Sequence, residues 1–332
     1  MAPLNTLLFS AGRRLELLRA FRRAYRELGV PGGVAACDAD PLAPALQEAD
    51  RAYVIPRLDD PRCLEAALEV CRREGGPLVF PLIDPDVLFL AKHRALLERA
   101  GARVAVLSEA NARVVSDKWE THRLFARLGL PTPWTRLPGT ATRSRLDYPV
   151  FVKPRFGSAG QGSMAARDRS ELDFHLARTD RPLVCELLPG PEITCDVACG
   201  WRGEPLAVSQ RRRIEARWGE VHKGVTVRDP AIERWCLRVA RTLRPRGPIT
   251  VQCILKGGKP RFTEINGRFA GGSPLSIAAG ADLPLWLLAR AAGRRVRVPP
   301  VGTYRLGLHL TRYDEAFYVE EEALGRLARG RL

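Results

Sequence analysis

The feature that most constrains the fold is the alternation of short apolar segments with amphipathic helical patterns along the first 110 residues. Apolar segments that read as buried strands occupy residues 4–10, 33–37, 78–81 and 104–107. Helical periodicity lies between them at residues 14–28, 62–74 and 86–100. Because strands that alternate with helices build a doubly wound parallel sheet, we expect an α/β, Rossmann-like N-terminal domain.

The turn after the first apolar segment tests one use of such a domain, the binding of a dinucleotide. This turn reads Ser10-Ala-Gly12-Arg13, and Asp38 ends the second predicted strand. The spacing G-x-G-x-x-G, which lets the backbone approach a pyrophosphate, is missing from this turn. The sequence therefore argues against NAD or FAD at this position.

A different pattern follows residue 110. A helical segment at residues 117–128 ends at Gly129, and the prolines beyond it are typical of a helix stop. Further helices are predicted at residues 169–177 and 230–243. Strands are predicted on both sides of a glycine-rich loop within residues 149–166, and at 182–187, 193–199, 206–213, 249–255 and 260–265. This part should form a mixed α/β body, and 332 residues suffice for two or three domains.

Hydropathy and cysteine usage indicate the compartment. No apolar run approaches the roughly 18 residues that a membrane-spanning helix requires. The N-terminus lacks the basic start and small-residue cleavage site of a signal peptide. The eight cysteines lie in apolar segments without C-x-x-C pairs, which is typical of buried free thiols. We expect a cytoplasmic protein with no membrane partner.

The net charge of +16 would suit a nucleic-acid partner, but its distribution argues against one. The chain has 47 Arg and only 6 Lys, and the arginines are spread along it without a basic tail. Arginine thus occupies the positions at which either arginine or lysine would serve. A lysine that remains is expected to be needed as a compact, flexible point charge.

One such lysine, Lys153, ends an apolar strand and is followed by a loop rich in glycine and serine. The small residues of the loop are Gly157, Ser158, Gly160, Gly162 and Ser163. Glycines let backbone amides approach oxyanions, and a lysine adds charge, so the segment suits phosphate binding. Because the lysine precedes the loop, this is not a Walker-type P-loop, and an ordinary hairpin is the alternative.

Two later segments carry polar side chains at strand ends. Glu186 and Glu192 flank a Pro-Gly turn, where they could meet a base and a ribose or simply face solvent. In a predicted hairpin, Glu264 and Asn266 share one face and Gln252 can face them from the other strand. Carboxylate and amide oxygens form the incomplete shell that Mg²⁺ accepts when it arrives with a nucleotide. Arg268, just beyond, could neutralise a transferring phosphoryl group.

With these motifs in this order, nearly the whole chain resembles the ATP-grasp superfamily, and in particular its carbamoyl phosphate synthetase large-subunit-like group of single-module ligases. The resemblance implies a Rossmann-like pre-ATP-grasp domain followed by a two-lobed ATP-grasp α+β fold. The expected divisions are residues 1–110 for the first domain, 111–185 for the small lobe and 186–332 for the large lobe. Asn266-Gly-Arg268 stands where the family often has Asn-Pro-Arg.

The resemblance also implies roles for individual residues, with ATP and Mg²⁺, or Mn²⁺ in its place, as cofactors. Lys118 and Lys153 would contact phosphates, and the loop 156–163 would close over them. Residues Glu186, Leu187 and Leu188 would read adenine, and Glu192 would hold the ribose. Gln252, Glu264 and Asn266 would sit at the magnesium sites, with Glu264 and Asn266 counted with Arg268 as catalytic.

The remaining expectations concern substrates. His222-Lys223-Gly224 falls where relatives place groups around the acyl phosphate, with a surface turn as the alternative. Candidate clamps for the substrate carboxylate are Arg268, the run Arg211 to Arg213, Arg305 and Arg312; for the run, a solvated strand edge is the favoured alternative in so arginine-rich a chain.

The activity that the resemblance implies is an ADP-forming ligase that activates a carboxylate as an acyl phosphate and couples it to an amine. Both substrates would be small molecules, and a homodimer could form through the N-terminal domain. One alternative is an enzyme that makes carboxy or formyl phosphate from bicarbonate or formate. Another is a basic nucleotide- or nucleic-acid-binding protein without catalysis.

Overall fold

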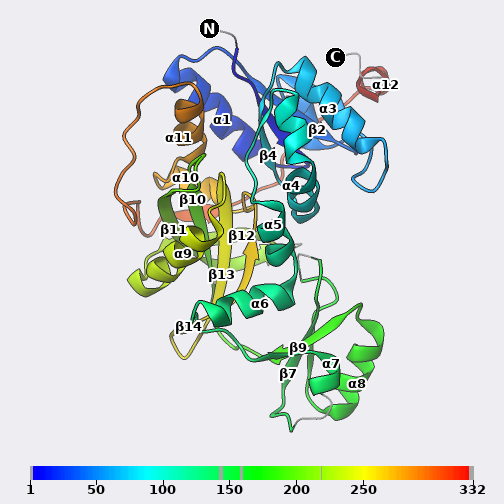
Figure 1. Cartoon of the computed structure of the whole chain (residues 1–332), viewed down its shortest axis with the longest axis vertical. Coiled ribbons are helices and arrows are strands. Elements are labelled where there is room, and N and C mark those ends of the chain that lie inside the picture. The colour runs from blue at the N-terminus through cyan, green and yellow to red at the C-terminus, as the bar shows by residue number, and fades with distance from the viewer. Residues whose placement is uncertain (1–2, 142–144, 158–159, 218, 329–332) are drawn as a thin grey trace.

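The computed structural model describes residues 3–141, 145–157, 160–217 and 219–328. Three sheets follow one another along the chain (Figure 1). The first has five parallel strands in the order β3-β2-β1-β4-β5. The strands are β1 Thr6–Phe9, β2 Val34–Asp38, β3 Arg51–Val54, β4 Leu78–Pro81 and β5 Arg103–Val104. The helices of this part are α1 Leu15–Leu28, α2 Pro44–Glu48, α3 Cys63–Arg73 and α4 Asp84–Arg99.

The parallel, doubly wound sheet that the sequence predicts is confirmed, although the pattern missed strand β3. This edge strand has only four residues and begins with Arg51, so its apolar signal is too short to stand out. The strand order reverses at β1, which pairs with β2 on one side and with β4 on the other. The carboxyl ends of β1 and β4 therefore lie side by side, at the place where such sheets commonly bind ligands.

Two helices, α5 Glu109–Ser116 and α6 Lys118–Arg127, lead to a four-stranded antiparallel sheet in the order β6-β9-β7-β8. Its elements are β6 Thr135–Arg136, α7 Pro138–Ala141, β7 Val150–Pro154, β8 Met164–Ala166, α8 Arg169–Arg178 and β9 Pro182–Glu186. The loop between β7 and β8 holds Gly157 at φ 100° and Gly160 at φ 70°. An added Cβ at either glycine would meet nothing within 4 Å, so the backbone conformation requires glycine there.

The third sheet has six antiparallel strands in the order β14-β13-β10-β11-β12-β15. The strands are β10 Glu192–Cys199, β11 Pro205–Arg217, β12 Glu220–Val227, β13 Pro248–Lys256, β14 Lys259–Asn266 and β15 His309–Thr311. The helices are α9 Pro230–Leu243, α10 Ser273–Ala278, α11 Leu283–Ala291 and α12 Glu321–Ala328. Strand β11 runs beyond the predicted segment and pairs with β12, so Lys223 lies in a strand rather than in a turn.

The hydrophobic core joins the first and third sheets and leaves the second apart. One buried cluster runs from Phe9 in β1 to Val251 in β13. A second joins Phe21 of α1 to Trp286 of α11. The small antiparallel sheet has its own core, formed by Ala141, Val150, Val152, Ala166, Leu172 and Val184. Figure 1 shows this small lobe standing away from the rest of the molecule.

The α/β class, with a parallel sheet followed by antiparallel ones, is confirmed, while the domain divisions at 110/111 and 185/186 stay predictions. All eight cysteines are buried free thiols. Among the helices within the described ranges, none has the length and apolar character needed to cross a bilayer.

Candidate active site

A cavity of about 380 Å³ lies between the small lobe and the six-stranded sheet. Most residues predicted for the nucleotide and metal sites line it: Lys118, Lys153, Gly157, Gly160, Ser163, Glu186, Leu187, Leu188, Glu192, Gln252, Glu264, Asn266 and Arg268. Gly162 is not part of the lining, although both its neighbours are. Ser158 lies outside the described residues. We call this space the nucleotide cavity.

Lys118 is fixed at one end of this cavity by the start of α6. Asp117 caps the helix by accepting from Trp119 N at 2.9 Å, and its carboxylate also binds the Arg155 guanidinium at 2.7 and 2.6 Å. The Lys118 amine donates to Gly157 O in the glycine-rich loop and lies 3.8 Å from Glu264 Oε1. Burial lowers the pKa of Lys118, an effect that Glu264 opposes. A buried ammonium beside a glycine-rich loop suits an anionic ligand.

The three oxygen donors meet on the β13–β14 hairpin. Gln252 stands opposite Glu264 in the register, and Asn266 stands opposite Thr250. Burial raises the pKa of Glu264, and Lys118 opposes the rise. Among the described residues, no group of three or more His, Cys, Asp or Glu could hold a metal ion. One carboxylate with two amides fits Mg²⁺ only where phosphate oxygens complete the shell, as ATP would provide.

Arg268 follows the hairpin and is held by the N-terminal domain. Its Nη2 donates to Asp84 Oδ2 at 3.0 Å, and its Nε lies 2.9 Å from Asp84 Oδ1. Asp84 is the first residue of α4, and two residues separate it from the end of β4. A two-contact guanidinium–carboxylate pair fixes orientation as well as position. The first sheet thus orients an arginine that lines the nucleotide cavity.

The turn that presents Asp84 is itself fixed by the buried Asp86. Its carboxylate accepts from Ser10 Oγ at 2.6 Å, Leu82 N at 2.9 Å and Ile83 N at 3.1 Å. Burial raises the pKa of Asp86 to about 7, although these three donors oppose the rise. A protonated Asp86 is therefore favoured in the folded protein over a pH range in which the unfolded chain has lost that proton.

This shift predicts a pH-dependent stability. As the pH rises from about 4 to about 7, Asp86 ionises in the unfolded chain before the folded one, so the free energy of unfolding should fall. Urea unfolding of wild type and Asp86→Asn across this range measures the effect. The fall should be smaller in the variant, which cannot ionise; equal pH dependence in both proteins would contradict the assignment.

At the other end of the nucleotide cavity, the two glutamates predicted to meet a base and a ribose are each paired with a basic side chain. The Glu186 carboxylate forms an ion pair with Lys256. Leu187 and Leu188, which follow it, line the cavity. Both carboxylate oxygens of Glu192 accept from Arg213 at 2.9 Å. Lys223 is not among the lining residues; its amine lies 2.8 Å from Glu215 Oε2. The phosphate-binding role predicted for Lys223 therefore finds no support in this geometry.

A smaller cavity of about 70 Å³ adjoins the nucleotide cavity and shares Gln252, Asn266 and Arg268 with it. Four arginines line it: Arg14, Arg211, Arg213 and Arg268. We call it the arginine cavity. The solvated strand edge favoured for the run Arg211 to Arg213 is wrong for two of its members. Alternation along β11 turns Arg211 and Arg213 inward, where Arg211 is 2% exposed and paired with Asp196, and leaves Arg212 outside.

The sequence reasoning missed the contributions of the first sheet. Arg14 follows β1 and Asp84 follows β4, so both lie where the strand order reverses. The rule that ligands bind at such a reversal could have flagged both turns. Of the other predicted clamps, Arg312 lines a third cavity, and Arg305 is exposed and donates to Ala278 O at 3.4 Å.

Comparison with known families assigns two regions of the chain. Residues 6–105 match the family described as PylC-like, N-terminal domain. Residues 178–312 match the family described as ATP-grasp in the biosynthetic pathway with Ter operon. These regions cover the parallel sheet and the six-stranded sheet, respectively.

Known proteins of similar sequence include carbamoyl phosphate synthases. That of Methanobrevibacter smithii is 26% identical over 74% of this chain and 70% of its own length. The large chain of Thermomicrobium roseum is 28% identical over 70% of this chain, which spans only 24% of that large chain. Among solved structures, the biotin carboxylase domain of the Hydrogenobacter thermophilus 2-oxoglutarate carboxylase has the same fold. Its TM-score is 0.73 at 20% identity, with 93% of this chain and 74% of that chain covered.

The matches therefore identify an ATP-grasp region at residues 178–312, and nearly the whole chain shares the fold of an ADP-binding biotin carboxylase domain. Over most of its length the chain is similar to carbamoyl phosphate synthases, with a PylC-like N-terminal domain before the ATP-grasp region.

Proposed function

We propose that the protein is an ADP-forming ligase that activates a carboxylate as an acyl phosphate and joins it to an amine. The observation that carries the proposal is the continuity of two cavities. The nucleotide cavity contains two lysines and the Gln252, Glu264 and Asn266 oxygens, and it shares Arg268 with the arginine cavity. A carboxylate seated among arginines would thus lie next to the γ-phosphate of a bound ATP.

The residues divide the work between the two cavities. Lys118 and Lys153 bind phosphate oxygens, and the backbone amides of the glycine-rich loop add donors. Gln252, Glu264 and Asn266 would hold Mg²⁺, which would supply positive charge to neutralise the transferring phosphoryl group. Arg268 lies where charge develops between nucleotide and acid, and Asp84 keeps it oriented.

The reaction requires no covalent bond to the protein. The acid carboxylate takes the γ-phosphoryl group, which releases ADP; the amine then attacks the acyl carbon, and phosphate leaves. The protein contributes positioning and charge stabilisation, and it excludes water that would hydrolyse the acyl phosphate.

The test is ADP and phosphate formation with MgATP over a panel of small carboxylates and amino acids, each with and without amines. The expected result is ADP formation that depends on one class of acid, together with an amide product when the amine is present. AMP and pyrophosphate as products, or magnesium-dependent ATP binding without turnover on any acid, would contradict the proposal.

The small volume of the arginine cavity favours one alternative within the same chemistry. About 70 Å³ suits bicarbonate or formate, which would give carboxy or formyl phosphate. Both acids therefore belong in the panel. Turnover with either one, and with no larger acid, would replace the carboxylate–amine ligase by this alternative.

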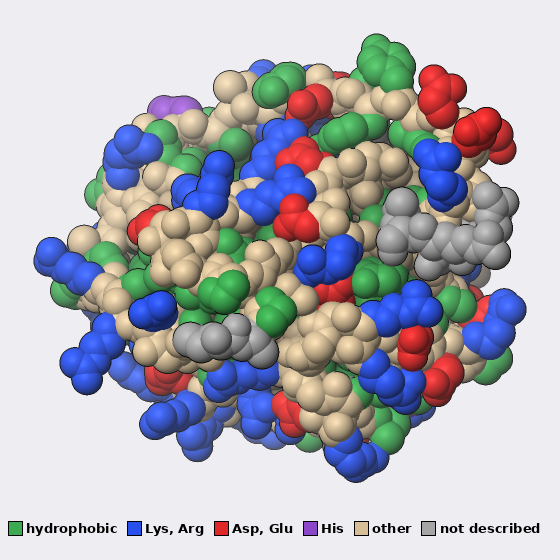
Figure 2. All heavy atoms as spheres, turned by 90° about the horizontal axis from the view of Figure 1, so that it is seen from above, with side chains coloured by type: hydrophobic (Ala, Val, Ile, Leu, Met, Phe, Trp, Pro, Cys, Tyr) green, Lys and Arg blue, Asp and Glu red, His purple; other side chains and the backbone are tan. Residues whose placement is uncertain are grey.

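Binding of nucleic acid has less support. Figure 2 shows Lys and Arg side chains dispersed over one face and interspersed with acidic ones. Many arginines there and elsewhere are paired within the chain, as Arg19 is with Glu48 and Arg22 with Asp50. A phosphate backbone is bound more strongly by a continuous basic stripe than by such scattered, partnered charges.

A further inference from the structure

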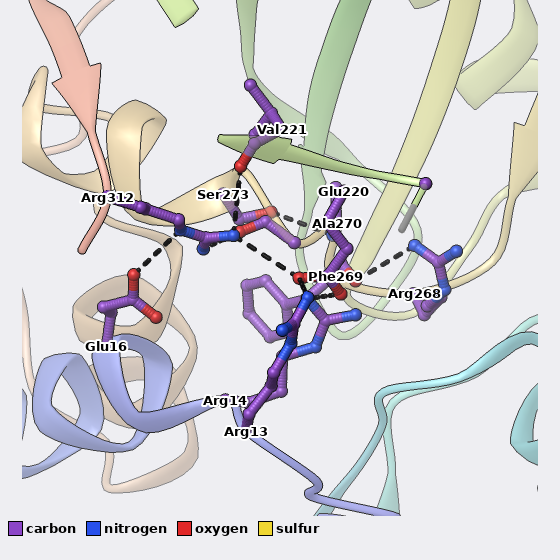
Figure 3. A network of polar contacts seen from close by, with 12 residues as sticks. Arg13, Arg14, Glu16, Glu220, Val221, Arg268, Phe269, Ala270, Ser273 and Arg312 are labelled. Carbon is purple, nitrogen blue, oxygen red and sulfur yellow. Dashed lines mark hydrogen bonds and ion pairs between the residues drawn. The ribbon is translucent and has the colours of Figure 1, made fainter. Parts of the chain in front are cut away.

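Three arginines converge on the carboxylate of Glu220, where the N-terminal domain meets the six-stranded sheet (Figure 3). Arg14 Nη1 lies 2.6 Å from Glu220 Oε1, and Glu220 Oε2 lies 3.4 Å from Arg312 Nη1 and 3.6 Å from Arg13 Nη2. Arg13 and Arg14 precede α1, whereas Arg312 follows β15. Segments from both ends of the chain therefore build one site for a carboxylate. We call Arg13, Arg14 and Arg312 the arginine seat.

Three positive charges gather in this seat. Glu220 and Glu16, the latter 3.1 Å from Arg312 Nε, face three guanidinium groups. Burial lowers the pKa of Arg14, Glu220 opposes this, and the neighbouring Arg268, Arg312 and Arg13 lower it further. Among the described residues, Arg14 Nη1 has no hydrogen bond of good geometry. A buried cation with cationic neighbours and a poorly aligned partner gains from a further anion.

The seat lies on a wall between two cavities. Glu220 and Val221 line both the arginine cavity and a third cavity of about 450 Å³, and Arg13 and Arg312 line the third one. A substrate whose reacting carboxylate lies beside Arg268 can therefore reach Glu220 with its other end. Glu220 is the first residue of β12, and its side chain is 23% exposed, so it has a path out of the seat.

Gly271, which has no side chain, lies beside the arginine seat. A Cβ at this position would lie 2.6 Å from Arg14 Nη1 and 2.8 Å from Glu220 Cδ. Arg312 Nη2 donates to Gly271 O. A side chain at residue 271 would thus fill the space between the arginines, which makes this glycine a steric probe of the seat.

We propose that the arginine seat binds a second carboxylate of the acid substrate and that Glu220 occupies the seat until the substrate arrives. The acid is then a dicarboxylate or an acidic amino acid. This inference rests on the proposed ligase function, because it takes the reacting carboxylate to lie in the arginine cavity. The distal carboxylate displaces Glu220 toward the 450 Å³ cavity, so the wall opens only for an acid that carries two charges.

The test measures binding and turnover separately on the full chain. Calorimetry with Mg²⁺ and a non-hydrolysable ATP analogue compares acetate with malonate, succinate, glutarate and glutamate at constant ionic strength. At least one of the dianionic or acidic probes should bind about tenfold or more tightly than acetate. Arg312→Gln should remove this preference, and Gly271→Ala should weaken it by filling the seat. Glu220→Gln should tighten dicarboxylate binding more than acetate binding, because it removes the charge that competes for the seat.

The exposed Arg113 on α5 provides the matched control, since Arg113→Gln removes the same charge far from the seat and should keep the preference. Acetate binding as tight as that of every other probe, or a preference that survives both Arg312→Gln and Gly271→Ala, would overturn the seat. ADP formation with monocarboxylates and no dicarboxylate preference would support the proposed ligase function and contradict the proposed role of the arginine seat. Dicarboxylate binding that depends on Arg312, with no ADP formed from any acid, would support the proposed role of the arginine seat and contradict the proposed ligase function.

Discussion

Replacing Glu264 by Gln is expected to lower acid-dependent ADP formation by about 10³-fold. Glu264 is the one carboxylate in the oxygen triad, and the amide that replaces it cannot neutralise a divalent cation. The measurement is steady-state ADP release with saturating acid at several Mg²⁺ concentrations. Higher Mg²⁺ should restore little of the loss, because the variant lacks charge at the position where the ion acts.

Glu69→Gln provides the matched control, since Glu69 is an exposed glutamate on α3. Its activity should equal that of wild type. Full activity in Glu264→Gln would remove Glu264 from the metal site, and full cellular function of that variant would favour a protein that binds ATP without using it.

Replacing Arg268 by Gln should lower kcat by about 10³-fold while the affinity for ATP changes little. Arg268 lines both the nucleotide and arginine cavities, so its charge should act mainly on the transferring phosphoryl group. Asp84→Asn should give a smaller loss, because Arg268 keeps its charge and loses only its two-contact partner. Single-turnover ADP formation separates this loss from slow product release.

Arg127→Gln on the exposed side of α6 is the control for the loss of one arginine, and it should be neutral. A rise in the KM for ATP without a change in kcat for Arg268→Gln would assign Arg268 to ground-state binding of the nucleotide instead.

The local patterns that the sequence carries explain why much of the fold was predictable. Strand alternation placed Glu264 and Asn266 on one face, and the turn at Gly257 and Gly258 indicated the hairpin. The register shift between Gln252 and Cys253, which brings Gln252 opposite Glu264, was not predicted. The glycines after Lys153 marked a loop whose backbone conformation requires glycine. These inferences depend only on neighbours along the chain.

The rest of the site depends on packing between remote segments. The pairing of Asp84 with Arg268 spans 184 residues, and the arginine seat joins Arg14 to a residue near the C-terminus. In an arginine-rich chain such pairs are hard to predict, because the sequence does not distinguish a buried arginine from an exposed one. Arg211 and Arg212 differ only in strand face, which becomes informative once β11 is known to have one side buried.

The separate core of the small lobe has a thermodynamic consequence for nucleotide binding. Among the described residues, its six buried side chains share no cluster with the other two cores, so a rigid-body rotation of the lobe would leave all three cores intact. Heat capacity changes in proportion to the apolar surface that is transferred to or from water. Closure over ATP would then contribute little to the heat capacity of binding, which would instead reflect the surface of the nucleotide cavity itself.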